Sequence, residues 1–259
     1  MCQKLTKELQ DLVAQAERVQ ARVELGRSKL ATAVAGANAN VKNDTATQPL
    51  PIKNEPFIKD KPQILLLRLS ATELPFFEEM AASFMQVLQN AADVKTATTP
   101  PEASRLLSSV SAVFVADAGI VEKKNLSLLK SLVDFAKGGG RVIFGGLFSS
   151  FIKPSELNSL LATNWQLPWK AGDYTRAVFN ANTAVKIPLP GIPESYSMKA
   201  LHLDRVELDQ RVYLRSQSSK QAPATIASVG TGVMGYIGDV NMEQETTALI
   251  LAMLGLNGH

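Results

Sequence analysis

Residues 112–146 read AVFVADAGIVEKKNLSLLKSLVDFAKGGGRVIFGG, and this stretch decides the fold. The apolar runs Ala112–Ala116 and Arg141–Gly145 each have the length and composition of a buried strand. Between them, Lys123–Lys137 places its leucines and its valine on one side, which predicts a helix, and the glycines at 138–140 end it. A strand, a helix and a second strand in this order predict a parallel pair joined by a helical crossover.

The same alternation continues on both sides of this unit. Ile64–Leu69 is another apolar run, and a helix is expected over Glu73–Ala92, with Pro75 in its first turn. After Asn164 the pattern becomes irregular, and shorter, antiparallel strands are expected there. The other predicted elements are strand Asp93–Ala97, helix Pro100–Ser108, helix Pro154–Ala162, strands Ala184–Ile187 and Val212–Arg215, hairpin strands Ala224–Val229 and Val233–Ile237, and helix Glu243–Leu256 capped by Asn241. We therefore expect a three-layer α/β sandwich with a mostly parallel central sheet.

Charge and cysteine content exclude several classes of function. The 259 residues carry 27 basic and 24 acidic side chains, for a net charge of +3, with one Cys and two His. Residues 1–62 hold ten of the basic and seven of the acidic side chains, so the remainder is neutral and a nucleic-acid partner is not expected. A single cysteine forms no intrachain disulfide, which favours a reducing, cytoplasmic location. No apolar run reaches the roughly 18 residues of a membrane span, and we expect no metal site and no cofactor.

The first 34 residues read as a separate helix. Apolar residues recur at spacings of four and three, which is the seam of a coiled coil. The seam positions expected to mediate oligomerisation are Leu5, Leu9, Leu12, Val19, Val23 and Leu30. A helix packed on its own domain explains the pattern equally well, so a homo-oligomer, a protein partner and an intramolecular contact all stay open. Residues 35–62, rich in Ala, Asn, Thr and Pro, are expected to form a linker, and residues 63–259 the α/β domain.

Three segments in order resemble the class I glutamine amidotransferase-like superfold, including its ThuA-like branch. They are an apolar strand that ends in Asp117–Gly119, the glycine-rich step Lys137–Gly146, and the late segment Gly230–Asp239 before the last helix. The stretches Gly146–Phe151 and Leu167–Tyr174 also resemble a group of fungal proteins with this fold. The resemblance implies a central parallel sheet of the amidotransferase or flavodoxin type over residues 63–256.

The residues that this family uses for catalysis are missing. The resemblance implies a Cys at the turn after a strand, with a His in the late loop. Here the turn, residues 144–150, reads FGGLFSS, and the late loop, residues 238–243, reads GDVNME. The only cysteine, Cys2, lies about 140 residues upstream. A thiolate activated by imidazole cannot be assembled from these segments, so we expect no glutaminase activity.

Other polar residues follow the predicted strands, where open α/β sheets place their ligands. Ser149, His202 and Asp239 are the alternative catalytic set of a hydrolase, although a helix cap and an ordinary strand histidine explain Ser149 and His202 as well. Two carboxylates, Asp117 and Asp239, could bind a divalent cation or a polar ligand, or simply cap turns. The full set of ligand-binding candidates is Asp117, Gly145, Gly146, Ser149, Asp239 and, in the aromatic insert, Trp169 and Tyr174.

The sequence thus favours a non-catalytic interaction or assembly protein that associates through its N-terminal helix. The alternative is a hydrolase or a small-molecule-binding protein with a site at the carboxyl ends of the strands.

Overall fold

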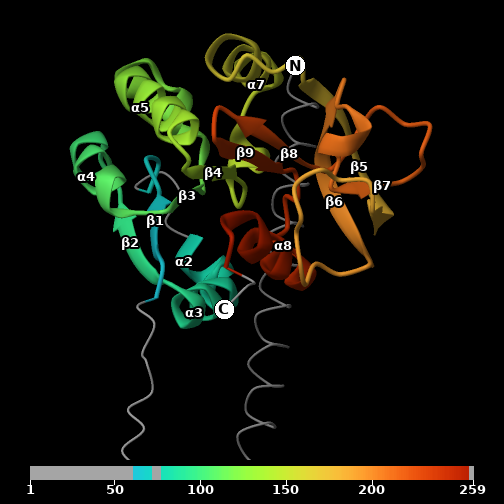
Figure 1. The fold of residues 1–259 in the computed structure, drawn as a ribbon, viewed down its shortest axis with the longest axis horizontal. Helices are drawn as coiled ribbons and strands as arrows, with labels where there is room; N and C mark the ends of the chain where they lie inside the picture. The colour runs from blue at the N-terminus through green and yellow to red at the C-terminus, as the bar shows by residue number, and fades with distance from the viewer. Residues whose placement is uncertain (1–60, 72–76, 257–259) are drawn as a thin grey trace, which may run out of the picture. The chain divides into compact units, whose positions relative to one another are not determined.

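The computed structural model describes residues 61–71 and 77–256, which form a six-stranded sheet, a three-stranded sheet and the helices around them (Figure 1). The strand order of the large sheet is β2-β1-β3-β4-β9-β8. Its strands are β1 (Gln63–Leu67), β2 (Asp93–Ala97), β3 (Ala112–Val115), β4 (Arg141–Phe144), β8 (Ala224–Val229) and β9 (Gly232–Ile237). All neighbours are parallel except β8 and β9, which form an antiparallel hairpin. The predicted, mostly parallel sheet is confirmed.

The central strands are apolar throughout because both of their faces are covered. In β1, Ile64 and Leu66 belong to one core cluster, whereas Leu65 and Leu67 belong to the other. Alternate side chains of a strand point to opposite faces, so the two clusters are the two sides of the sheet. Helices therefore pack on both faces, as expected for a three-layer α/β sandwich.

The helices divide between these faces (Figure 1). The first face is covered by α2 (Phe77–Met80), α3 (Ala82–Ala91) and α8 (Gln244–Leu254). The second is covered by α4 (Pro100–Leu106), α5 (Leu126–Lys137), α6 (Phe148–Phe151), α7 (Pro154–Ser159) and the π-helical turn η4 (Leu160–Asn164). Short 3₁₀ turns are η1 (Leu107–Ser109), η2 (Ala118–Val121), η3 (Lys123–Asn125) and η5 (Leu208–Gln210).

The second sheet was the weakest part of the sequence prediction. It has the order β6-β5-β7, with β5 (Lys170–Ala181), β6 (Ser195–Asp204) and β7 (Tyr213–Leu214), all antiparallel. The expected strand Ala184–Ile187 is wrong, since that segment is irregular, and the expected strand at 212–215 shrinks to two residues. The long strand β5 was missed because glycine, lysine and aspartate interrupt its first half, where a β-bulge also shifts the register.

Helix boundaries differ from prediction in instructive places. The single helix expected over 73–92 is divided at Ala81 in its described part, and the helix expected from Lys123 begins as the turn η3. The expected cap, Asn241, does not cap α8, because the N-cap position falls on Glu243 and its N–H is bonded to Asp239.

The N-terminal helix and the linker lie outside the described residues, so the heptad seam stays a sequence prediction. Within residues 61–71 and 77–256, no helix is long and apolar enough to cross a membrane.

Candidate functional site

The carboxyl ends of β1, β3, β4 and β9 lie at one edge of the sheet because these strands are parallel. The chain winds from β1 to β2 on one side and then returns to β3 on the other, so the strand order reverses between β1 and β3. Open α/β sheets bind ligands at such a reversal, outside the carboxyl ends of the strands. The candidate site is therefore the edge where the β1 and β3 loops meet.

Asp117 follows β3 and joins these two loops. Its carboxylate accepts hydrogen bonds from the backbone N–H of Ser70, at 3.0 Å, and of Gly119, at 2.9 Å. The side chain is only 3% exposed. Burial raises the pKa of Asp117, although the N–H donors and the charge of Arg68 oppose that shift. One carboxylate oxygen thus joins the β1 and β3 loops, and the other holds the turn that follows β3.

A pocket of about 260 Å³ lies between these loops and the segment after β4. It is lined by Ser70, Ala118, Gly119, Val121, Glu122, Phe151, Lys153 and Glu156. Its charged groups are already paired: Lys153 contacts Glu156 at 3.1 Å, and Glu122 contacts Lys124 at 2.9 Å. The sequence prediction placed a ligand at this edge but named none of the charged residues that line the pocket. The only sequence signal for these residues is their position in the loops that follow buried strands.

The turn after β4 has the shape of an elbow but carries apolar side chains. Gly146 adopts a left-handed conformation with φ of 62°, and the N–H of Leu147 bonds to the carbonyl of Ala116 at 2.9 Å. Leu147 and Phe148 are buried, and the Phe148 ring lies 4.8 Å from that of Phe144. The positions next to the turn are therefore part of the hydrophobic core, and they present no nucleophile.

Ser149 and Ser150 tie the helix α6 to the end of β9. The buried hydroxyl of Ser149 donates to the carbonyl of Ile237 at 2.6 Å, and that of Ser150 donates to the carbonyl of Val240 at 3.3 Å. A serine nucleophile instead needs a base that takes its proton. Ser149 donates a hydrogen bond to a backbone carbonyl, which is a structural contact.

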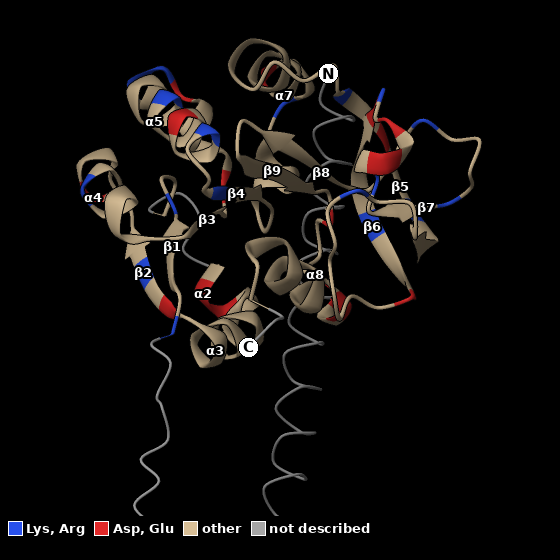
Figure 2. Ribbon diagram, in the orientation of Figure 1, with Lys and Arg blue, Asp and Glu red and all other residues tan. Residues whose placement is uncertain are grey.

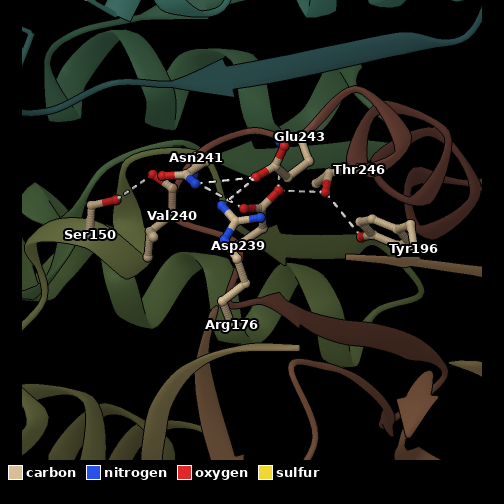
Figure 3. A network of polar contacts seen from close by, with 8 residues as sticks. All are labelled: Ser150, Arg176, Tyr196, Asp239, Val240, Asn241, Glu243 and Thr246. Atoms are coloured by element: carbon tan, nitrogen blue, oxygen red, sulfur yellow. Dashed lines mark hydrogen bonds and ion pairs between the residues drawn. The ribbon is translucent and has the colours of Figure 1, made fainter. Parts of the chain in front are cut away.

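Asp239, just after β9, organises the start of α8 (Figure 3). Its carboxylate accepts from the N–H of Asn241 at 3.0 Å, the N–H of Glu243 at 2.7 Å and the hydroxyl of Thr246 at 2.6 Å. Thr246 is in turn bonded to the Tyr196 hydroxyl of β6, at 3.0 Å. Burial raises the pKa of Asp239 despite these donors. Asp239 therefore holds the turn that leads into α8 and, through Thr246, connects that helix to the second sheet.

The remaining predicted site residues lie in other places. His202, on β6, packs edge-on against the ring of Phe179, with centroids 5.2 Å apart, and burial lowers its pKa. Trp169 is fully buried and donates through Nε1 to Gln210 at 3.0 Å, whereas Tyr174 is 54% exposed on β5. The described residues contain no group of three His, Cys, Asp or Glu side chains placed to hold a metal ion.

Comparison with known proteins identifies the fold and no family. No family model and no curated protein sequence matches the chain. Among solved structures, cytoplasmic protein STM1381 from Salmonella typhimurium LT2 is similar at a TM-score of 0.52 and 14% identity, over 75% of this chain and 99% of that one. At this identity the similarity shows a shared α/β fold.

Two further matches are weaker. A ThuA-like protein from Bacteroides uniformis aligns at a TM-score of 0.49 and 10% identity, over 82% of this chain and 94% of that chain. A β-galactosidase from the haloarchaeon Halorubrum lacusprofundi aligns at 0.49 and 17% identity, over 77% of this chain. This chain spans only 31% of the length of that β-galactosidase.

Proposed function

We propose that this chain is a non-catalytic interaction protein, in which a degenerate amidotransferase-like domain serves as a scaffold and the N-terminal heptad segment joins it to a second copy or to another protein. One observation carries the first half of this proposal: Asp117, Ser149 and Asp239, the polar groups at the strand ends, all use their oxygens to hold the backbone together. Groups that are fully engaged in this way do not serve as nucleophile, base or ligand without breaking those contacts.

The second half rests on the sequence. Leu9 and Val23 occupy seam positions of the heptad pattern, where an apolar side chain packs into a partner helix and a buried charge is strongly unfavourable. Gln10 and Ala21 lie off the seam, where the same charge would stay in water.

Light scattering on the full chain tests the assembly role. A protein with Leu9→Asp and Val23→Asp is expected to have a lower molar mass than the wild type, with Gln10→Asp and Ala21→Asp as the matched control that keeps the wild-type mass. Equal masses for all three proteins, together with no stably bound protein partner, would refute the assembly role.

A second candidate, a small-molecule-binding protein, is favoured by the pocket at the strand-order reversal. Phe151, which lines it, and Leu126, which does not, are both 50% exposed. If this candidate is right, a thermal-shift screen should find a compound that raises the Tm of the wild-type protein. The same compound should raise the Tm of Leu126→Ala but not that of Phe151→Ala. If no compound in a screen of small amines, carboxylates and phosphates behaves in this way, the small-molecule-binding function is refuted.

A further inference from the structure

The strand β5 has one edge that is open over its middle. It pairs with β6 along most of its length, but with β7 only at Asn180 and Ala181. At the other end of this edge, the N–H of Ala171 donates to the side-chain oxygen of Asn158 in α7, at 2.7 Å. Between Ala171 and Asn180, no strand lies beside this edge of β5 among the described residues.

The backbone groups that face the open edge follow from the alternation of an antiparallel ladder. The N–H of Ala181 donates to Glu194 on the β6 side, at 2.7 Å. Successive residues point their N–H and C=O groups to opposite edges, so those of Val178, Arg176 and Tyr174 point away from β6. In the described part of the chain, no hydrogen bond reaches these six groups. An edge of this kind is a template for another strand.

The side chains along this edge have a distinctive pattern. Tyr174 and Val178 are 54% and 59% exposed, and Arg176 lies between them on the same face of the strand. Lys199 of β6 stands directly opposite Arg176 in the register, and its ammonium lies 5.0 Å from the centroid of the Tyr174 ring. Figure 2 shows basic sequence on β6 in blue. Like charges in directly opposed positions destabilise a sheet. Arg176 keeps 45% of its side chain exposed while one of its nitrogens contacts Glu243 at 2.8 Å.

We propose that this edge binds an extended peptide segment of a partner protein, which adds a strand beside β5 and carries a carboxylate opposite Arg176. The six unpaired backbone groups supply the hydrogen bonds of strand addition. The carboxylate forms a charge-assisted contact with the exposed part of Arg176, beside its ion pair with Glu243. Apolar side chains two residues to either side of it lie opposite Tyr174 and Val178, where cross-strand pairs make contact. The recognised peptide therefore has an acidic residue at its centre and an apolar residue two positions to either side, with any residue at the positions between.

The groups that form this edge all belong to β5 and β6, and the heptad variants at Leu9 and Val23 change none of them. Loss of assembly through the heptad seam and loss of peptide binding are therefore separate outcomes.

A palindromic probe tests the proposal without assuming a strand direction. The probe is fluorescein-labelled Thr-Val-Thr-Glu-Thr-Val-Thr, and its control replaces the central Glu by Lys. Fluorescence anisotropy with the full chain is expected to give a Kd below ~1 mM for the acidic peptide and binding at least about tenfold weaker for the lysine peptide.

Variants of the protein locate the binding. Arg176→Glu should reverse the preference between the two peptides, whereas Arg105→Glu, the same charge change on α4, should leave it unchanged. Val178→Pro removes an N–H that points to the open edge and should abolish binding without disturbing the β6 ladder. Circular dichroism and Tm measurements check that each variant is folded. If Arg176→Glu does not fold, Arg176→Gln takes its place, and this variant should bind both peptides equally well. Equal affinity of wild type for both peptides, no binding of either, or an unchanged preference in the position 176 variant overturns the proposal.

Discussion

At the scale of single residues, the carboxylates at the strand ends act as internal connectors. Asp239 accepts from two backbone N–H groups and from Thr246, and Asp117 accepts from two N–H groups in different loops. A buried donor that loses its acceptor costs about 1–3 kcal/mol. These residues therefore determine stability more than they determine chemistry.

Removing the Asp239 carboxylate should be costly. Asp239→Ala leaves the N–H of Glu243 and the hydroxyl of Thr246 without their acceptor, so the free energy of unfolding should fall by about 2–4 kcal/mol in urea denaturation. Asp134→Ala, on the exposed face of α5, is the matched control and should stay within about 0.5 kcal/mol of wild type. A loss at Asp239 no larger than that at Asp134 would contradict the connector role.

Asp117 should make stability depend on pH in a defined direction. Its pKa in the folded protein is raised above 3.8, so the folded state holds this proton more tightly than the unfolded state does. The free energy of unfolding of wild type relative to Asp117→Asn should therefore decrease as pH rises from about 3.8 through the raised pKa, and level off above it. Urea denaturation of both proteins from pH 3 to pH 7 measures this difference. A difference that grows with pH would show that the hydrogen bonds outweigh burial.

At the scale of elements, the turn between β8 and β9 is fitted to the end of α5. Gly230 has φ of 60°, and a Cβ there would lie 2.5 Å from the carbonyl oxygen of Lys137. Gly138, in the same junction, has φ of −83°, and its Cβ would make only ordinary contacts. Close approach of backbone to backbone thus explains the glycine at one position and not at the other.

These two glycines give a matched pair of substitutions. Gly230→Ala combines left-handed backbone strain with a backbone clash, so it should lower the free energy of unfolding by about 2 kcal/mol or more. Gly138→Ala should change it by less than about 1 kcal/mol. Chemical denaturation of both variants provides the measurement, and equal losses would mean that the junction adapts to a Cβ at either position.

The success of the sequence prediction also varied by element. The strands β1, β3 and β4 were predictable because strands buried on both faces are continuously apolar. The strand β5 was not, since Lys170–Ala181 alternates small, charged and aromatic residues and contains a bulge. Asp239 was recognised as a strand-end group, but its contact with Glu243 at the start of α8 depends on the turn through Met242, whose φ of 49° no local pattern indicated.

At the scale of the whole molecule, an α/β domain with engaged strand-end groups is combined with an N-terminal segment of heptad pattern. The domain supplies a pocket and an open strand edge, whereas the heptad seam supplies the means of association in our proposal. Burial of an apolar seam between helices is the standard driving force for such association. Removal of the N-terminal segment should therefore abolish association and leave the α/β domain folded.

The most direct test compares the molar mass of the full chain with that of residues 35–259 by light scattering over a range of concentrations. We predict that the full chain, of 27.9 kDa per copy, forms a species of at least two copies or binds a protein partner stably, and that the shortened chain does neither. The same number of copies in both proteins, with no partner bound to the full chain alone, would contradict association through the N-terminal segment.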